Sequence, residues 1–370
     1  MVLRAPIGGL YRHVMDLSEA LSLRGHQIGL VMDSATSDAQ TDARLEALSI
    51  APALGVHKMP ISRLLGPHDL STTYNIRKIA REQNVDVLHG HGAKGGFNAR
   101  LTRMGSRRTI AAYTTHGGVL NYNGNPLVGK ALLALEKIIL PLTDAMIFES
   151  AYVKKSFEAA IGPPPHLSQI VYNGLAPSEF VPLSPDLAEF DFSFVGELRA
   201  IKGVDILLRA LVDVRRANGE PATLIIAGAG PDEDKIRALI EQLNLNGRVD
   251  LAGVRPARQI FARAHCVVMP SLAESLPYVA LEAAAAAKPL LATNVGGVKE
   301  IFGPTANSLL PPSDVTALKK AMQATIDNPQ AAASEMKSRL EWVKANFSME
   351  MMTSAIEDIY YKALDRIRHK

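Results

Sequence analysis

Two glutamates, Glu274 and Glu282, frame the segment AESLPYVALE, which joins a short apolar run to an alanine-rich stretch. Apolar periodicity predicts a strand before Glu274 and a helix that contains Glu282. Ligands of open α/β sheets bind beyond the carboxyl ends of the strands. Carboxylates at such a position suit hydroxyl groups, so we expect Glu274 to contact a sugar and Glu282 a ribose. The alternative for Glu282 is an ordinary solvated helix residue.

The residues after Glu274 predict how this helix begins. Ser275 is a suitable N-cap, and Pro277 is a suitable first helical residue. Backbone N–H groups at the start of a helix attract anions. We therefore expect Ser275, Leu276 and Pro277 to form a substrate-binding segment that places phosphates between the two glutamates.

Two cations, Arg199 and Lys202, follow another predicted strand in VGELRAIKGVDILL (195–208). A diphosphate suits this pair, because arginine binds it through two parallel hydrogen bonds and lysine acts as a point charge. Cations at a helix N-terminus oppose the helix dipole, which is a small cost that a bound anion would offset. The alternative is a solvated start of the helix.

Glycines occupy two predicted strand-to-helix turns. Gly8 and Gly9 in APIGGLYRHVMDL would let the backbone approach a phosphate, although a tight turn explains them equally well. Gly228 and Gly230 in GAGPDED are further candidate substrate-binding residues. They match half of a dinucleotide fingerprint, but Glu233 replaces its third glycine, which disfavours a nicotinamide-dependent oxidoreductase.

His116 in YTTHGG follows a predicted strand, where it could hydrogen-bond a sugar or an incoming nucleophile. The alternative is a turn histidine at the end of a strand. His89 and His91 have a spacing that suggests a metal site, but the sequence indicates no third ligand. We therefore predict no metal.

Short apolar runs alternate with helical patterns along the whole chain, which predicts two α/β domains with parallel sheets and helices on both faces. Three prolines near 161–175 indicate a linker, so we place the domains at 1–165, completed by a helix at 348–370, and at 166–347. Helices are expected at 10–25, 204–219 and 232–247, with Gly219 and Gly247 closing the last two. Strands are expected at 27–33, 86–91, 109–117, 145–150, 190–197, 223–230, 248–253, 265–271 and 289–294.

Composition excludes several classes of protein. The chain has 370 residues, 47% of them hydrophobic, and a net charge of +3. Residues 1–165 hold 18 basic and 13 acidic residues (+5), and the remainder holds 22 and 24 (−2). This mild bias without basic blocks does not indicate nucleic-acid binding. It suits an anionic membrane surface or a polyanionic substrate equally well, and the alternative is a scattered, solvated surface. Arg100, Arg103, Arg107 and Arg108 are the candidate lipid-facing residues.

The remaining signals concern location and the chain start. No apolar run reaches the ~18 residues of a membrane span. Cys266 is the single cysteine, which we expect to be buried and inert in a reducing cytoplasm. The opening MVLRAP leaves about four residues for a first strand that usually has five or six, so a few residues upstream are expected to be missing.

The segment PSLAESLPYVALEAAAAAKPLLATNVGGVKE (270–300) resembles the donor-binding signature of family 4 glycosyltransferases. The resemblance covers nearly the whole chain, because DVLHGH, YTTHGG, IFES, VYNG, KGVDILL and IIAGAGPDED also match. The signature positions here are Pro270, Ser271, Glu274, Pro277, Glu282, Pro289, Gly296, Gly297 and Glu300.

The resemblance implies a GT-B fold, two Rossmann-like domains facing across a cleft, and a retaining hexosyltransferase without an obligatory metal or other cofactor. It implies that Glu274 binds donor-sugar hydroxyls, Glu282 the ribose, Arg199 and Lys202 the diphosphate, and that His116 lies on the acceptor side. The implied donor is a UDP- or GDP-sugar. The implied acceptor is a glycan or a lipid-linked glycan of envelope polysaccharide synthesis, in the cytoplasm or at the inner face of the membrane.

Two positions depart from the family pattern. Glu197 follows Gly196 where an arginine is usual, so we expect Arg199 to take over the phosphate contact. Lys288 stands where a glycine usually precedes Pro289. Two other functions stay open: transfer to a small soluble acceptor such as a sugar phosphate or inositol derivative, and non-catalytic binding of sugar nucleotides.

Overall fold

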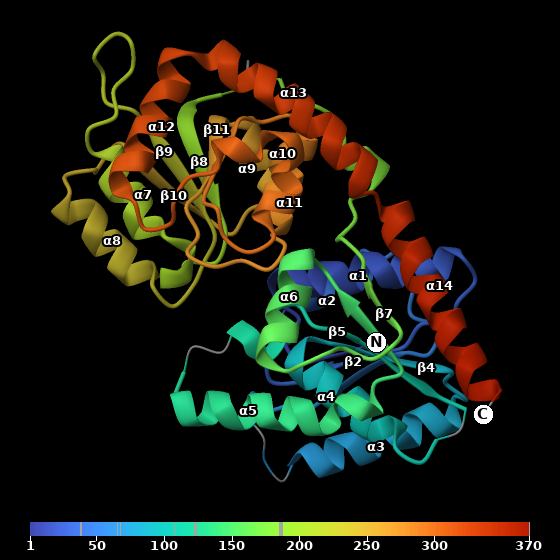
Figure 1. Ribbon diagram of the computed structural model, residues 1–370. Coiled ribbons are helices and arrows are strands. Elements are labelled where there is room, and N and C mark those ends of the chain that lie inside the picture. The colour runs from blue at the N-terminus through green and yellow to red at the C-terminus, as the bar shows by residue number, and fades with distance from the viewer. Residues whose placement is uncertain are drawn as a thin grey trace. The chain divides into compact units, whose positions relative to one another are not determined.

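The computed structural model describes residues 1–37, 39–64, 66, 68–106, 108–121, 124–184 and 188–369. The chain forms two compact units, which are described separately below. Unit 1 comprises Met1–Gly174 and Met349–Lys370, and unit 2 comprises Leu175–Ser348. Both units are α/β structures with parallel sheets, as the alternating apolar pattern predicts (Figure 1).

Unit 1 contains a seven-stranded parallel sheet in the order β3-β2-β1-β4-β5-β6-β7. Its register pairs Val2 with Val31 on one side and with Gly90 on the other. The strands are β1 (Val2–Leu3), β2 (Leu30–Asp33), β3 (Val56–Met59), β4 (Val87–His91), β5 (Ile110–Thr114), β6 (Ala145–Phe148) and β7 (Ser168–Ile170).

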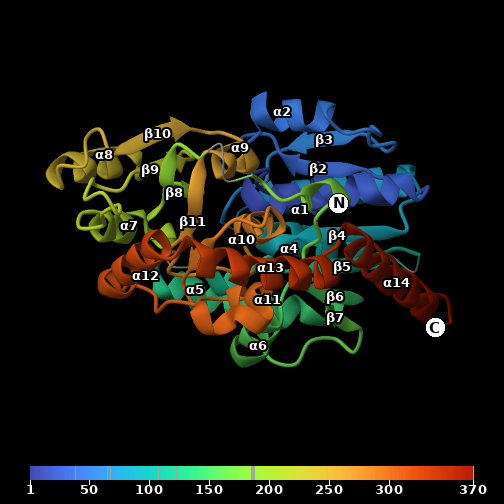
Figure 2. The same ribbon diagram turned by 90° about the horizontal axis from the view of Figure 1, so that it is seen from above.

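Helices cover both faces of this sheet (Figures 1 and 2). Strand residues alternate between the faces, so Ile110 and Ala112 pack towards α1 and α14, whereas Tyr113 packs towards α6. The helices of unit 1 are α1 (Gly8–Leu23), α2 (Ala39–Glu46), α3 (His68–Glu82), α4 (Gly92–Arg103), α5 (Pro126–Ile139), α6 (Ala151–Ala160) and α14 (Met349–Arg368).

The C-terminal helix α14 belongs to unit 1, as predicted for 348–370. Both views show this red helix beside the blue and green elements of unit 1 (Figures 1 and 2). Ile356 and Ile359 are buried in the core that α1 and the sheet share. Arg24 of α1 pairs with Glu357 at 2.7 Å, so a charged contact joins the two helices at their edge.

Unit 2 contains a five-stranded parallel sheet in the order β10-β9-β8-β11-β12. Phe192 and Phe194 of the central strand are fully buried, as expected for a strand covered on both sides. The strands are β8 (Phe190–Val195), β9 (Leu224–Ala227), β10 (Val249–Gly253), β11 (Ala264–Met269) and β12 (Leu290–Ala292).

The core of unit 2 packs α7, α8 and α12 against one face of the sheet, and α9 packs on the other. Cys266 lies in this core as predicted, and burial raises the pKa of its thiol to about 12. The helices are α7 (Val204–Leu211), α8 (Glu233–Gln242), α9 (Ala257–Ala262), α10 (Tyr278–Ala285), α11 (Val298–Phe302), α12 (Val315–Asp327) and α13 (Pro329–Asn346).

Two helix ends were predicted wrongly. The helix α7 ends at Leu211 rather than near Gly219, because the following residues form a hairpin in which Arg216 N–H donates to Glu220 O at 2.8 Å. The helix α8 ends at Gln242, and Asn244 takes the left-handed conformation (φ +53°) that we assigned to Gly247. Asparagine tolerates that conformation better than most other residues.

The division between the units differs from the predicted boundary at 165/166. The strand β7 pairs with β6 through Met146 and Ser168, so residues 168–170 complete the sheet of unit 1. The two units separate after this strand, between Gly174 and Leu175. In the described part of the chain, no helix is long and apolar enough to cross a membrane.

Candidate functional site

The predicted cation Lys202 and the predicted sugar-binding Glu274 lie together in unit 2. Lys202 Nζ donates to Glu274 Oε1 at 2.6 Å, although 72 residues separate them. Lys202 follows β8 and Glu274 follows β11, which are neighbours at the point where the strand order of the sheet reverses. In open α/β sheets, ligands bind at this reversal. The sequence predicted both residues, and the sheet order brings them into contact.

Backbone contacts hold the two loops together. The N–H of Leu272 donates to the carbonyl of Ile201 at 2.8 Å, so the loop after β11 is bonded to the loop after β8. Gly203 has a φ of +66°, and a Cβ there would lie 2.2 Å from the carbonyl oxygen of Pro270. A larger residue at 203 would therefore push Lys202 away from Glu274.

The carboxylate of Glu274 is oriented by its own neighbours. Ser271 Oγ donates to Glu274 Oε1 at 2.7 Å, and Thr293 Oγ1 donates to the carbonyl of Ser271. Gly296 packs against the backbone of Glu274, because a Cβ would lie 1.7 Å from its carbonyl oxygen. Gly296 thus has a steric role beside the carboxylate.

Arg199 lies in the same loop but is more exposed than Lys202. Its Nε lies 3.3 Å from Glu197 Oε1, and the two side chains are about half exposed. The carboxylate of Asp232 accepts the N–H of Ala200 at 2.8 Å and fixes the backbone next to Arg199. Arg199 can therefore turn towards an anion at little cost, and Glu197 competes for it.

The helix start after Glu274 is shifted from the prediction. The helix α10 begins at Tyr278, and its N-cap is Pro277, without a side-chain cap. The prediction of Ser275 as N-cap and of Pro277 as first helical residue was therefore wrong. Leu276 is buried, and the side chain of Glu282 is partly buried inside α10.

The other predicted glycines of unit 2 have a packing role. A Cβ at Gly228 would lie 1.8 Å from Gly196 O, and one at Gly230 would lie 2.3 Å from Leu198 O. These contacts hold the loop that leads from β8 to Lys202. Close backbone packing by itself explains both glycines.

The family pattern has a glycine before Pro289, where this chain has Lys288. The left-handed backbone falls on Ala287, with a φ of +53°, and not on Lys288. Lys288 is buried, and its Nζ donates to Ala264 O at 2.9 Å. Burial lowers the pKa of this ammonium group. Lys288 therefore anchors β11 from inside the fold.

The loop that carries His116 in unit 1 has an unusual backbone. His116, Gly117 and Gly118 have φ values of +46°, +76° and +44°. The buried Glu149 holds this turn, because its Oε2 accepts the N–H of His116 at 3.1 Å and the hydroxyl of Thr115 at 3.0 Å. Burial raises the pKa of Glu149. The histidine is therefore positioned by a carboxylate from the neighbouring strand.

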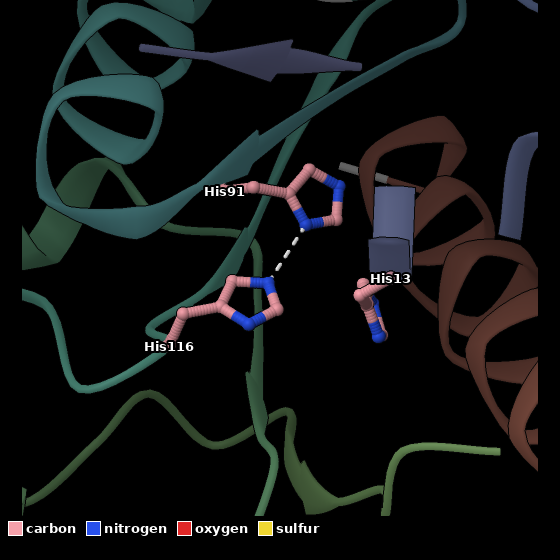
Figure 3. A group of neighbouring side chains, drawn as sticks. All are labelled: His13, His91 and His116. Atoms are coloured by element: carbon pink, nitrogen blue, oxygen red, sulfur yellow. Dashed lines mark hydrogen bonds between the residues drawn. The ribbon is translucent and has the colours of Figure 1, made fainter. Parts of the chain in front are cut away.

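His116 is one of three neighbouring imidazoles (Figure 3). His91 Nδ1 lies 3.2 Å from His116 Nε2, and the ring centroids of His13 and His116 are 4.8 Å apart. His13 Nδ1 lies 3.1 Å from Asn173 Oδ1. Burial lowers the pKa of His13 to about 4 and the pKa values of His91 and His116 well below 6.5. The rings are therefore neutral at physiological pH.

These three histidines bear on the prediction of no metal. That prediction relied on the absence of a third ligand beside His89 and His91, and this premise was wrong, because His13 and His116 join His91. His89 is instead bonded to Tyr360 and Thr114 at 2.6 and 2.7 Å. The three candidate nitrogens lie within 4.8 Å of one another, whereas nitrogens that share one zinc ion are about 3.3 Å apart. The present spacing fits packed, hydrogen-bonded imidazoles.

A cavity of about 310 Å³ opens beside His91 and His116 in unit 1. The predicted glycine turn lies next to it: α1 starts at Gly8, which has a φ of +63° and no atom within 4 Å of an added Cβ. The neighbouring residues Ile7 and Leu10 line the cavity, as do Arg4 and Arg63, which sequence reasoning did not select. The signal available for Arg4 was its position at the end of the short first strand that the sequence predicted, whereas no strand was predicted before Arg63.

The prediction of a lipid-facing arginine cluster was wrong for Arg100 and Arg103, whereas Arg108 is exposed and stays a candidate. Arg100 is fully buried and forms two hydrogen bonds with Glu136, at 2.6 and 3.0 Å. Arg103 pairs with Asp144 at 2.8 Å, and Arg108 lies 3.7 Å from the carboxylate of Asp86. Arg107 lies outside the described residues. Carboxylates of unit 1, Glu136 and Asp144, therefore pair with Arg100 and Arg103.

Known proteins resemble both halves of the chain. The model of Glycosyltransferase Family 4 matches residues 7–179, and the model of Glycosyl transferases group 1 matches residues 179–346. Glycogen synthase of Mycobacterium tuberculosis is 26% identical, in an alignment that covers 96% of this chain and 92% of that protein.

Solved structures share the fold over the full length. Sucrose-phosphate synthase of Thermosynechococcus elongatus superimposes with a TM-score of 0.80 at 20% identity, covering 99% of each chain. Alr3699/HepE of Anabaena, solved in complex with UDP, superimposes with a TM-score of 0.78 at 19% identity, covering 98% of this chain and 99% of that one.

Proposed function

This chain belongs to glycosyltransferase family 4 and has the GT-B fold, and from that premise we propose that it transfers a sugar from a UDP- or GDP-sugar to a glycan or lipid-linked acceptor with retention of the anomeric configuration. The proposal assigns the donor to unit 2 and the acceptor to unit 1. The observation that carries it is the contact of Lys202 with Glu274 beyond the ends of β8 and β11.

The donor end of the proposal follows from the charges of this site. A nucleoside diphosphate would attract Lys202 and the exposed cation Arg199, while the carboxylate of Glu274 would accept hydrogen bonds from hydroxyl groups of the sugar. Negative charge grows on the leaving diphosphate as the glycosidic bond breaks. Cations that are already fixed near that position stabilise the transition state more than the ground state. Alr3699/HepE binds UDP, which makes UDP-sugars the first donors to test.

The acceptor end is assigned to the cavity beside His116. A neutral imidazole nitrogen can either accept a hydrogen bond from a hydroxyl or donate one to it. His116 Nε2 contacts His91 Nδ1, so Nδ1 is the nitrogen of His116 that we assign to the acceptor. The lowered pKa of His116 keeps it in this form at physiological pH. Glu149 fixes the backbone of His116, so the ring has a defined direction at the cavity wall.

Envelope polysaccharide synthesis, with the protein in the cytoplasm and peripheral at the membrane, completes the proposal. The amphipathic helix α5 supports it in place of the arginine cluster. Leu127 and Ile138 are 75% and 74% exposed, and Lys130 and Lys137 are its exposed charged residues. Attraction to anionic lipid is worth about 1 kcal/mol per basic residue near the surface. Flotation with anionic vesicles should therefore recover the protein at low salt, and Lys130→Gln with Lys137→Gln should abolish it.

The experiment that tests the function is a panel of UDP- and GDP-sugars. A ligand at 100 times its Kd stabilises the folded state by about 2.7 kcal/mol, which a thermal-shift measurement resolves. The donor that stabilises the protein is then incubated with glycan and lipid-linked acceptors, and NMR reports the anomer of the product. Stabilisation by no nucleotide sugar would contradict the donor assignment, and an inverted product would contradict retention. Transfer only to a small soluble acceptor would contradict the envelope setting.

A further inference from the structure

The cavity of unit 1 contains two arginines that lack partners. Arg4 follows β1 and Arg63 follows β3, and both line the cavity. Within the described part of the chain, neither guanidinium forms a salt bridge or a hydrogen bond. Each positive charge lowers the stability of the other, and burial together with the charge of Arg63 lowers the pKa of Arg4. Repulsion between these two positive charges raises the free energy of the folded protein, and a bound anion would remove this cost.

The other charged groups around the cavity are already compensated. Lys94 forms an ion pair with the buried Asp69, and Glu136 is bonded to Arg100. Asp33 is the carboxylate whose negative charge raises the pKa of Arg4. Its oxygens already accept the backbone N–H of Ile61 at 2.9 Å and the hydroxyl of Thr36 at 3.0 Å. The histidines of the wall are neutral. The net charge that faces the cavity is therefore positive.

Helix starts add to this potential. The helix α4 begins at Gly92 with the N-cap His91, which provides no side-chain cap, and Gly92 and Ala93 line the cavity. The first N–H groups of a helix have no partner within the helix and attract anions. This helix start adds to the positive potential at the cavity, but the two arginines supply most of it.

Much of the remaining cavity lining is apolar. Leu10 and Phe97 line it together with Leu132, Leu135 and Ile139 of α5. Two residues of its rim, Ile7 and Leu64, are 59% and 51% exposed. An entirely polar glycan would leave these side chains against water or hydroxyl groups. The cavity therefore combines an unpaired dicationic end with an apolar wall.

We infer that the acceptor is an amphiphilic phosphate ester whose phosphate binds Arg4 and Arg63 and whose apolar group contacts Leu10, Phe97 and α5. This inference rests on the proposed function and narrows its acceptor from glycans in general to phosphate-linked ones. Planar guanidinium groups bind phosphate through paired hydrogen bonds. The apolar group is either the chain of a lipid phosphate or a shorter apolar group of a soluble phosphate ester.

Calorimetry with three probes tests this chemistry without any transfer reaction. The probes are hexyl phosphate, inorganic phosphate and hexyl glucoside. We expect hexyl phosphate to bind at least tenfold more tightly than either of the others. Equal binding of hexyl glucoside would overturn the role of the arginines, and equal binding of inorganic phosphate would overturn the role of the apolar wall.

Arg63→Gln, Arg4→Gln and the control Arg81→Gln locate the site. Arg63 is exposed, so its replacement leaves the core intact, and Arg81 is an exposed arginine of α3 outside the cavity. A hydrogen bond to a charged group is worth about 1.5–3 kcal/mol, so each cavity variant should weaken hexyl phosphate about tenfold to hundredfold, with Arg81→Gln unchanged. Unchanged binding in both cavity variants would overturn the inference.

Two further measurements separate this inference from the proposed function and identify the source of the phosphate. The affinity for the sugar nucleotide should stay unchanged in Arg63→Gln. If the wild-type protein does not bind the sugar nucleotide, the proposed function is contradicted, whereas the inference about the phosphate-binding arginines is not. In transfer assays, a sugar linked by phosphate to a long prenyl chain and the same sugar phosphate with a hexyl group distinguish a lipid from a soluble acceptor. The inference requires that Arg63→Gln raise the KM of the acceptor that is used.

Discussion

Lys202 Nζ and Glu274 Oε1 are 2.6 Å apart, so the cation and the carboxylate of the donor site neutralise each other before any ligand binds. The side chain of Glu274 is 9% exposed and that of Lys202 is 26% exposed, which places the pair at the edge of the protein interior. A diphosphate that takes over Lys202 would release the carboxylate for sugar hydroxyls. In the proposed function, the pair would therefore couple recognition of the diphosphate to recognition of the sugar.

Replacement of Lys202 tests this coupling. Lys202→Ala should lower kcat by about 10²- to 10³-fold and change the KM of the donor much less, because the charge that Lys202 meets grows in the transition state. Lys235→Ala is the matched control, since this exposed lysine also pairs with a carboxylate at 2.6 Å. A variant in which only the donor KM changes would show that Lys202 binds ground state and transition state equally.

Glu274 and Glu282 are expected to bind different parts of the donor. Glu282→Ala should weaken UDP and UDP-sugar to the same extent, whereas Glu274→Ala should weaken the UDP-sugar more than UDP. Loss of one hydrogen bond to a charged group corresponds to about 1.5–3 kcal/mol. Calorimetry with UDP and a UDP-sugar measures both variants, and unchanged affinities in both would disprove the assignment.

Glu149 is expected to act through His116. Glu149→Ala removes the acceptor of the His116 N–H and leaves a left-handed histidine without support, so kcat should fall about tenfold or more. Glu149→Gln keeps an oxygen at this position and should retain most of the activity. Binding of the sugar nucleotide to unit 2 should be the same in both variants. Equal activity of the alanine and glutamine variants would exclude the positioning role.

Acid is expected to destabilise unit 1. The folded protein holds His13 with a pKa of about 4, below the 6.5 of an unfolded histidine, so the unfolded state binds more protons between these values. Stability therefore falls as the pH drops from 6.5 to 4, and this shift corresponds to about 3 kcal/mol. The lowered pKa values of His89, His91 and His116 act in the same direction.

Chemical denaturation at a series of pH values measures this slope. The variant His13→Gln should flatten it, and His68→Gln, an exposed histidine of α3, should leave it unchanged. If the free energy of unfolding depends on pH as steeply in His13→Gln as in the wild type, groups other than His13 cause the acid sensitivity.

Chelation should leave transfer unchanged. In the described residues, the one group of three ligating side chains is His13, His91 and His116, whose spacing is wide for a shared ion. In the proposed function, Lys202 and Arg199 supply the positive charge that a diphosphate requires. Turnover after dialysis against EDTA should equal that before dialysis, with added Mg²⁺ as the comparison. A loss of activity that Mg²⁺ or Zn²⁺ restores would contradict the metal-free proposal.

The sequence by itself determined the fold class and selected most residues of the proposed donor site. Alternation of apolar runs with helical patterns specified parallel sheets, because strands covered by helices on both faces must be apolar throughout. The positions of Arg199, Lys202 and Glu274 just after strands placed them at one edge of a sheet, since parallel strands end at the same edge. The glycines were visible in the sequence, but whether each serves a ligand or backbone packing was not.

Tertiary structure decided which charged side chains pair with other residues of the protein and which can bind a ligand. Arg100 and Arg103 look like surface cations in the sequence, but Glu136 and Asp144 from distant segments pair with them. Arg4 and Arg63 look ordinary in the sequence, and both line one cavity with guanidinium groups that form no salt bridge or hydrogen bond to any residue that the structure describes. Local patterns report the helix or strand on which a residue lies, whereas the partner of a charge depends on contacts between residues far apart in the chain. For that physical reason, only the folded chain distinguishes an internal ion pair from a binding site.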